Sequence, residues 1–221
     1  MEEIRKAHNQ HKRDLIEAVT READAVLDVG CGFGGDLQKW RARKVGSLNM
    51  CDPSRGALQE AKTRARNMKI HVNFYEGDIT ACPNRKFDVI CFNFSLHYIF
   101  ATRELFETSL KEIRKRAKPG CRLCGIIPDS MRLIWRCPVK DELGNWFMLR
   151  NTSNGDFGEK VFVELKDTPF YADGPKSEPL AHRDALVTAL EEHGFELQTW
   201  ENLQGAEITE LYSKFIFVYQ K

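Results

Sequence analysis

The sequence predicts an α/β fold in which a mostly parallel sheet carries helices on both faces. The first observation behind this prediction is a short apolar run at residues 25–29, which breaks into a cluster of glycines before a helical pattern resumes over residues 36–43. The second is a series of further strand patterns, most of them separated by helical ones, at residues 48–51, 70–75, 89–92 and 122–127. A strand, a glycine turn and a helix form the opening of a nucleotide-binding βαβ unit.

Length and composition point to one globular domain spanning residues 1–221. The chain has 42% apolar and 29% charged residues, as ordinary globular proteins do, and 221 residues are too few for two well-buried domains. The formal net charge of +1 excludes a polycation that coats nucleic acid without specificity. A local basic groove stays compatible with that charge.

The seven cysteines are scattered, and we interpret them as buried free thiols rather than as metal ligands. Cys121 and Cys124 form a C-x-x-C pair, but a zinc site needs a second pair, and in a strand these two side chains point to opposite faces. No metal site is therefore expected. The chain also lacks a run of about 18 apolar residues, and its charged amino terminus is no signal peptide. We expect an intracellular protein without membrane contact.

The first half of the chain supplies the elements around the glycines. Residues 1–24 are polar with apolar positions such as Leu15, Ile16 and Val19, which predicts an amphipathic helical segment. After the strand at residues 48–51, Ser54 is placed to cap a helix that runs to Met68.

The second half completes the sheet. A helix over residues 105–117 leads into the strand at residues 122–127, and a helix over residues 179–193 precedes two final strands at residues 195–200 and 214–219. Those strands have no helix-length segment between them, so the last one is expected to be antiparallel in a sheet of seven strands. Residues 128–178 are too long for a simple connection and predict an inserted hairpin or lid near the ligand.

Glycines and acids at the strand ends predict the ligand. Gly30, Gly32 and Gly35 fit G-x-G-x-x-G, and Asp52 lies about 20 residues further on, where it can accept hydrogen bonds from a ribose diol. A nicotinamide cofactor and S-adenosylmethionine both fit this pattern. Asp28 before the first glycine favours S-adenosylmethionine. Asp78, after the third strand, is a candidate partner for the adenine amino group.

With these elements in place, the chain resembles the messenger RNA cap guanine-N7 methyltransferases, which have a Rossmann-like class I fold. Four signatures carry the resemblance. They are H-N-Q-H-K at residues 8–12, D-V-G-C-G-F-G-G-D-L-Q-K-W at residues 28–40, N-F-S-L-H-Y-I-F at residues 93–100, and the isolated Glu178 and Tyr212. The compact outline also resembles the enzymes of large DNA viruses.

The resemblance implies roles for individual residues. Those expected at the cofactor are Lys12 on its carboxylate, Asp28, Gly30, Gly32, Asp52, Asp78, Asn93 and Tyr98. Those expected at the cap guanine and its phosphates are His8, Asn9, Arg64, His97, Tyr98, Glu178 and Tyr212. Three positions depart from the family pattern. His8 replaces an Asn, Asn93 replaces a Gln, and Phe33 stands where the family often has a lysine that reaches the triphosphate, so Arg64 is expected to carry more of that contact.

The implied reaction is methyl transfer from S-adenosylmethionine to N7 of the terminal guanine of the GpppN cap, leaving S-adenosylhomocysteine. Guanine N7 carries a free lone pair and the donor is a sulfonium, so an in-line displacement needs no general base. Rate can come from holding N7 and the methyl carbon close and collinear, which is worth about 7–11 kcal/mol at best. The absence of a catalytic acid or base in the sequence is therefore expected.

Other functions fit parts of the pattern. The chain can be an S-adenosylmethionine methyltransferase for a small molecule or protein, or a catalytically silent module that binds RNA or a partner; the intact Asp28, Asp52 and Asp78 argue against the silent module. Asp28 and the reversed last strand disfavour a nicotinamide oxidoreductase. As a capping enzyme it would bind the capped mRNA 5′ end as a monomeric domain. Guanylyltransferase and triphosphatase domains in a longer chain, or an activating subunit, are further expected partners. Its expected location is the nucleus if it is cellular, and the host cytoplasm or the virion if it is viral.

Overall fold

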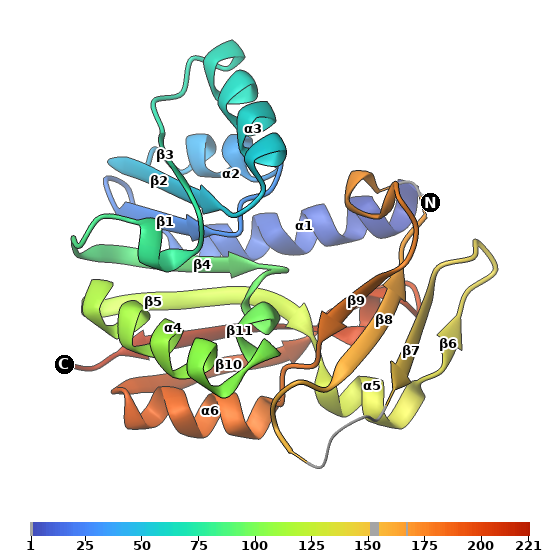
Figure 1. Cartoon of the computed structure of the whole chain (residues 1–221). Coiled ribbons are helices and arrows are strands. Elements are labelled where there is room, and N and C mark those ends of the chain that lie inside the picture. Colours follow the sequence, from blue (N-terminus) through green and yellow to red (C-terminus); the bar gives the residue numbers. More distant parts are fainter. Residues whose placement is uncertain (1, 151–154, 167) are drawn as a thin grey trace.

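A sheet of seven strands forms the centre of the molecule (Figure 1). The computed structural model describes residues 2–150, 155–166 and 168–221. In spatial order the strands are β10 (Phe195–Asn202), β11 (Tyr212–Tyr219), β5 (Ala117–Pro128), β4 (Phe87–Asn93), β1 (Ala25–Val29), β2 (Ser47–Asp52) and β3 (Asn73–Glu76). The strands from β5 to β3 run parallel, and β11 is antiparallel to both of its neighbours. The predicted fold class, including the reversed last strand, is confirmed.

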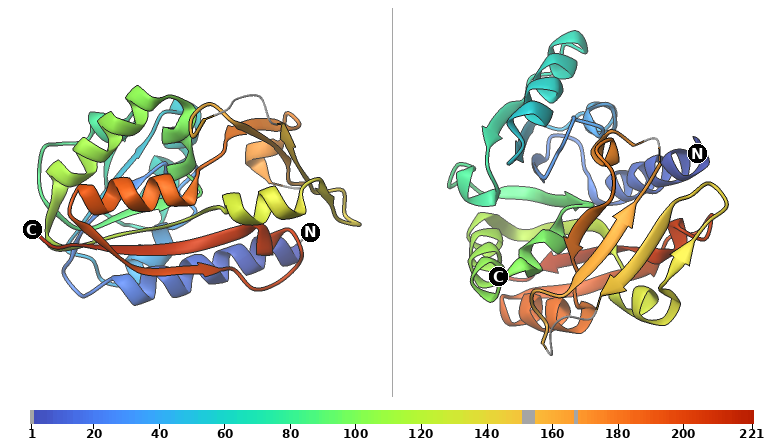
Figure 2. Two further views of the ribbon diagram at one scale, coloured as in Figure 1. Left: turned by 90° about the horizontal axis from the view of Figure 1, so that it is seen from below. Right: turned by 45° about the vertical axis from the view of Figure 1, so that its right-hand side comes forward.

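Helices cover both faces of this sheet, as predicted. They are α1 (Glu2–Val19), α2 (Leu37–Ala42), α3 (Arg55–Asn67), α4 (Arg103–Arg116), α5 (Ser130–Arg136) and α6 (Arg183–Glu192). One apolar cluster joins the sheet to α1, α2 and α3, and a second joins the other face to α4 and α6. The left view of Figure 2 shows α1 on the opposite side of the sheet from α4 and α6. Cys121 belongs to one cluster and Cys124 to the other, so the two thiols do point to opposite faces.

The connection after β1 requires a glycine at position 30. Gly30 has φ +74°, and a Cβ on it would lie 2.4 Å from the Cβ of Ser95, the second residue after β4. The Ser95 hydroxyl donates to the carbonyl of Val29 at 2.6 Å, which holds the two strand ends together. A side chain at position 30 would therefore push apart the connections that follow β1 and β4.

Residues 128–178, predicted as a hairpin or lid, contribute a second sheet. After α5 come the antiparallel strands β6 (Val139–Lys140), β7 (Trp146–Arg150), β8 (Lys160–Glu164) and β9 (Lys176–Pro179), with a 3₁₀ turn η3 (Pro169–Tyr171) before β9. In Figure 1 strands β1, β2 and β4 point toward this sheet. The helix predicted over residues 179–193 begins only at Arg183, because residues 176–179 pair with β8 and so extend the chain.

Two further findings concern the described part of the chain. None of its helices is long and apolar enough to span a membrane. All seven cysteines are free thiols, and no group of three or more histidines, cysteines or acids within the described residues is arranged to hold a metal ion.

Candidate functional site

The carboxyl ends of β1 and β2 form the first half of the candidate site. Asp52 ends β2 and is almost completely buried. One of its carboxylate oxygens accepts from the backbone N–H of Gly32 at 2.7 Å, and the other accepts from the N–H of Ser54 at 2.8 Å. Each carboxylate oxygen has a second lone pair. Asp52 is therefore held rigidly and can still accept hydrogen bonds from a ligand hydroxyl.

The glycine loop leaves open space beside this carboxylate. Gly32 has φ +51°, and a Cβ built on it meets no atom within 4 Å. The residues present thus fit a ligand such as S-adenosylmethionine, with its ribose against Asp52 and its methionine part over the glycine loop. Asp78, predicted to contact the adenine, is exposed at the start of the 3₁₀ turn η1 (Ile79–Ala81), where one of its oxygens accepts from Thr80 N at 2.8 Å. Its contact with an adenine stays a prediction.

Two lysines meet at Asp36, the residue before α2. Nζ of Lys12 from α1 lies 2.8 Å from Asp36 Oδ1, and Nζ of Lys39 lies 2.7 Å from the same atom. Asn93 Nδ2 donates to Oδ2 of the aspartate at 3.0 Å, and Lys39 also donates to Asn9 Oδ1 at 3.1 Å. Burial alone would raise the pKa of Asp36, but the two ammonium groups lower it to about 2. This ionic cluster fixes α1 against the glycine loop.

Asp28 lies beneath the loop rather than in the open space. Its side chain is buried and accepts from the indole Nε1 of Trp40 at 2.8 Å. Burial, and then the negative charge of Asp36, raise the pKa of this carboxyl. The structure thus gives Asp28 a partner in α2, Trp40. Asp28 would act on a ligand only indirectly, by supporting the glycine loop.

The second half of the site surrounds Glu178 on β9. Nε2 of His97, in the 3₁₀ segment η2 (Leu96–Ala101), lies 3.0 Å from Glu178 Oε2, and the hydroxyl of Tyr171 donates to Oε1 at 2.7 Å. The hydroxyl of Tyr98 lies close enough to this carboxylate to help lower its pKa, and the Tyr98 ring lies 4.3 Å from that of His97. Burial raises the pKa of Glu178, but the bonds from His97 and Tyr171 hold it below its usual value. A buried anion is therefore kept ionised beside a half-exposed aromatic ring.

An aromatic group connects the two halves. The rings of His8, Phe94 and Tyr212 lie 5.0 to 5.2 Å from one another. Burial, then the charge of Lys12, lower the pKa of His8 to about 3, so its ring is neutral. Burial and the nearby charge of Glu178 raise the pKa of the Tyr212 hydroxyl. This group therefore stands between Lys12 on one side and Glu178 on the other.

Residues 93–98 carry both halves of the site. Asn93 ends β4 and contacts Asp36, whereas His97 and Tyr98 contact Glu178. Phe94 between them has φ +59°, a strained value for a bulky residue. Oδ1 of Asn93 is buried and, among the described residues, has no hydrogen-bond partner. An unpartnered buried acceptor at this junction fits a site completed by a ligand.

Most of the predicted site residues converge, but Arg64, like Asp78, does not. Arg64 lies on the exposed side of α3, where its guanidinium pairs with Glu60 at 2.9 Å, one helical turn away. The structure does not bring it into contact with the groups above, so its role at the cap phosphates stays a prediction. Phe33 is partly exposed on the glycine loop.

Three residues at the site were missed in the sequence analysis. Asp36 and Lys39 are part of the G-G-D-L-Q-K-W signature, and their spacing of three residues at a helix start could have indicated a pair. Tyr171 had no comparable signal. It lies in an irregular segment, and only the folding of the second sheet places its hydroxyl on Glu178.

Sequence comparisons show which family this chain matches. Residues 1–149 match the sequence model of the mRNA (guanine-N(7))-methyltransferase domain. The mRNA cap guanine-N(7) methyltransferase of Candida glabrata is 32% identical over 176 residues, which cover 71% of this chain and 42% of that protein. The enzyme of the same name from Saccharomyces cerevisiae is 34% identical over 141 residues, 58% of this chain and 32% of that protein. The chain thus spans less than half the length of these relatives. Both relatives are cellular, so they lend no support to the resemblance to viral enzymes.

Solved structures agree in fold. An S-adenosylmethionine-dependent methyltransferase from Clostridium acetobutylicum superposes with a TM-score of 0.67 at 17% identity, covering 98% of this chain and 92% of the other. The N-methyltransferase NodS from Bradyrhizobium japonicum, in complex with S-adenosyl-L-homocysteine, gives 0.65 at 16% identity, covering 98% and 87%. At such identities the likeness establishes the fold alone.

Proposed function

This chain belongs to the mRNA (guanine-N(7))-methyltransferase family, and we propose that it transfers a methyl group from S-adenosylmethionine to N7 of the terminal guanine of a GpppN cap. The observation that carries most of this proposal is the buried Glu178, held ionised by His97 and Tyr171 next to the open ring of Tyr98. An anion in this position suits an acceptor with paired N–H donors, such as guanine. Residues 1–221 would act as one catalytic domain, with residues 128–178 supplying Glu178 and Tyr171.

The cofactor would bind across the glycine loop. Asp52 accepts from the ribose hydroxyls, and Asp78 accepts from the adenine amino group. Gly30 and Gly32 allow the loop backbone to approach the ligand closely. The ammonium group of Lys12 has three donors, so it can pair with the carboxylate of the cofactor and keep its bond to Asp36. Asn93 can offer its free Oδ1 at the same place.

The guanine would bind against Glu178. The carboxylate accepts from guanine N1–H and from the 2-amino group, a charge-assisted pair that adenine cannot provide. Tyr98, His97 and Tyr212 offer ring faces or edges for the base, and one good stack is worth roughly 1–3 kcal/mol. His8 and Asn9 would approach the cap from α1, and Arg64 would approach the phosphates.

The chemistry requires placement and charge rather than proton transfer. When bound, the cofactor would supply a methyl group on a positively charged sulfur; a bond from N7 to the methyl carbon would form as the carbon–sulfur bond breaks, with S-adenosylhomocysteine as the leaving group. Positive charge then spreads onto the guanine ring. Glu178 is an anion in a buried site, so its attraction to the ring grows as this charge develops. Its position thus favours the transition state over the uncharged substrate.

A capped mRNA 5′ end is the partner that this function requires. Triphosphatase and guanylyltransferase domains in a longer chain, an activating subunit, a monomeric state and a nuclear or cytoplasmic location stay predictions.

The decisive experiment follows a labelled methyl group. The protein is incubated with labelled S-adenosylmethionine and RNA ending in GpppN, in ApppN or in an uncapped triphosphate. We expect transfer to GpppN alone, with the label recovered as 7-methylguanosine after digestion. Transfer to another acceptor, or cofactor binding without any transfer, would contradict the proposal.

A further inference from the structure

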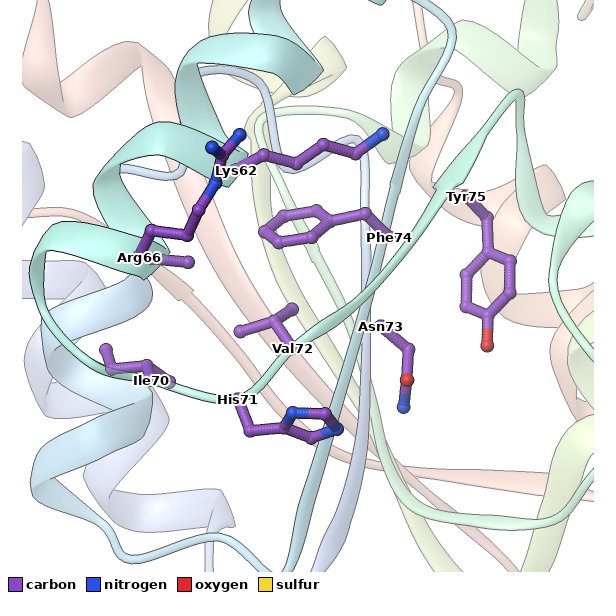
Figure 3. Close-up of a pocket in the computed structure, with 9 residues that line it drawn as sticks. Lys62, Arg66, Ile70, His71, Val72, Asn73, Phe74 and Tyr75 are labelled. Carbon is purple, nitrogen blue, oxygen red and sulfur yellow. The ribbon is translucent and has the colours of Figure 1, made fainter.

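A hollow lies on the outer side of α3, at the edge of the sheet formed by β3. Its volume is about 480 Å³. Figure 3 shows its walls, which come from the second half of α3 and from the segment that returns into β3. The lining residues are Lys62, Ala65, Arg66, Ile70, His71, Val72, Asn73, Phe74 and Tyr75. None of them contributes to the site described above.

The charged side chains at this hollow, Lys62 and Arg66, are cations without an acidic partner among the described residues. Residues 55–69 contain five lysines and arginines and one glutamate, a net charge of +4 in a chain whose total is +1. Glu60 pairs with Arg64, on the other flank of the helix. Within the described part of the chain, no ion pair neutralises Lys62 or Arg66. The remaining cations thus face the hollow or the solvent.

The floor of the hollow is apolar. Phe74, Val72 and Ile70 are half-buried and pack against the cluster beneath α3. In Figure 3 the ring of Phe74 lies between the side chains of Lys62 and Val72. Cations over a partly open aromatic floor are the combination that binds single-stranded nucleic acid, because phosphates contact the cations while sugars and bases cover the apolar surface.

We propose that this hollow binds the single-stranded RNA that follows the cap, through the RNA phosphates and without a preference for sequence. This inference rests on the proposed function. The helix α3 begins three residues after Asp52, at the ligand edge of the sheet, and carries Arg64 in its last turn. RNA that follows α3 from the ligand edge would pass Arg55 at its start and reach Lys62 and Arg66 at the hollow. The hollow adds affinity for the transcript and leaves the methyl transfer step unchanged.

The test compares a short unstructured RNA with the cap alone. In Lys62→Gln/Arg66→Gln we expect the affinity for uncapped single-stranded RNA, measured by fluorescence anisotropy, to fall roughly tenfold at physiological salt. The plot of log K against log salt has a negative slope, and its magnitude should decrease by about 1.4 because two phosphate contacts are lost. The KM for capped RNA should rise in parallel, while the kinetics with a GpppN dinucleotide stay unchanged.

A matched control removes the same charge elsewhere. Lys111 and Arg114 are exposed on α4, across the sheet from α3, and Lys111→Gln/Arg114→Gln should leave RNA binding unchanged. The proposal is overturned if the Lys62/Arg66 variant binds RNA with the wild-type affinity and salt slope, or if the control loses as much. Absence of methyl transfer by the wild type would instead contradict the proposed function, and the binding measurement would still decide the role of the hollow.

Discussion

Asp36 and Glu178 are both buried carboxylates, but their partners differ. Asp36 lies against two ammonium groups and an amide, so its charge is neutralised inside the protein. Glu178 accepts from the hydroxyl of Tyr171, lies 3.0 Å from Nε2 of His97, and has the hydroxyl of Tyr98 nearby. The charge of His97 helps to lower the pKa of Glu178, but Tyr171 is a neutral donor, so this carboxylate has one ionisable partner whereas Asp36 has two. The first carboxylate thus serves to hold α1 and the loop together, whereas the second keeps a negative charge for a ligand.

The difference follows from what each half of the site has to do. The loop around Asp36 has to be rigid before the cofactor arrives, and a closed ionic cluster provides that. The surroundings of Glu178 have to respond to charge that appears on the guanine only during the reaction. Substitutions should therefore affect stability at one carboxylate and catalysis at the other.

The largest effect is expected at Asp36. Asp36→Asn leaves Lys12 and Lys39 without an anion in a largely buried place, which should lower the free energy of unfolding by about 3 kcal/mol. Urea unfolding measures this. Glu60→Gln, which removes an exposed pair with Arg64, should cost at most about 0.5 kcal/mol. Equal losses in the two variants would show that the Asp36 cluster does not hold the loop.

The next largest effect should come from Glu178→Gln. The amide keeps the size of the side chain but loses its charge, and its NH₂ group faces the donors of guanine. We expect kcat/KM for GpppN to fall about a hundredfold, the loss of hydrogen bonds to a charged acceptor. Cofactor affinity, measured by calorimetry, should be unchanged. A decrease of less than threefold would contradict the proposed guanine contact.

A smaller effect is expected from Tyr171→Phe. Loss of one donor to Glu178 should lower kcat/KM for GpppN about tenfold, mainly through KM. Because that hydroxyl helps to hold the pKa of Glu178 down against burial, its removal raises this pKa. The acid limb of the pH–rate profile should therefore move to higher pH. An unmoved limb would indicate that Tyr171 only packs.

The smallest effect at neutral pH concerns His8, which links the two halves. Its pKa is lowered from 6.5 to about 3 by burial, so the unfolded chain takes up a proton in this interval and the folded chain does not. Stability is thus lost as pH falls through that window. His8→Phe keeps the ring contacts without the titration. Urea unfolding should show the wild type losing about 2 kcal/mol more than the variant between pH 7 and pH 5; equal losses would exclude this role for His8.

Local features of the site were predictable from the sequence. The apolar run before Gly30, the glycine spacing and the cap at Ser54 act over a few residues, so their pattern indicates β1, the loop and α3 directly. The order of the elements also predicted that β11 would run antiparallel to its neighbours. The position of Asp52 followed from the same unit, because the carboxyl ends of parallel strands share one edge of the sheet.

The residues at the guanine side were named only through the family resemblance, and their geometry could not be derived from any local pattern. Glu178, predicted before a helix, lies in β9, because backbone pairing with β8 outweighs the weak helical signal that follows. Tyr171 lies only seven residues before Glu178, but no sequence pattern in η3 indicates that its hydroxyl would be directed at this carboxylate, and β9 reaches η2 only by packing. The amino-acid sequence by itself thus determined β1, the glycine loop and the place of Asp52. Lys12 and Asn93 were named through the family resemblance, and they meet Asp36 across 24 and 57 positions of the chain. Only the tertiary structure brought Glu178 on β9 to His97 in η2, 81 positions earlier in the chain, because that contact depends on how the second sheet packs against the end of β4.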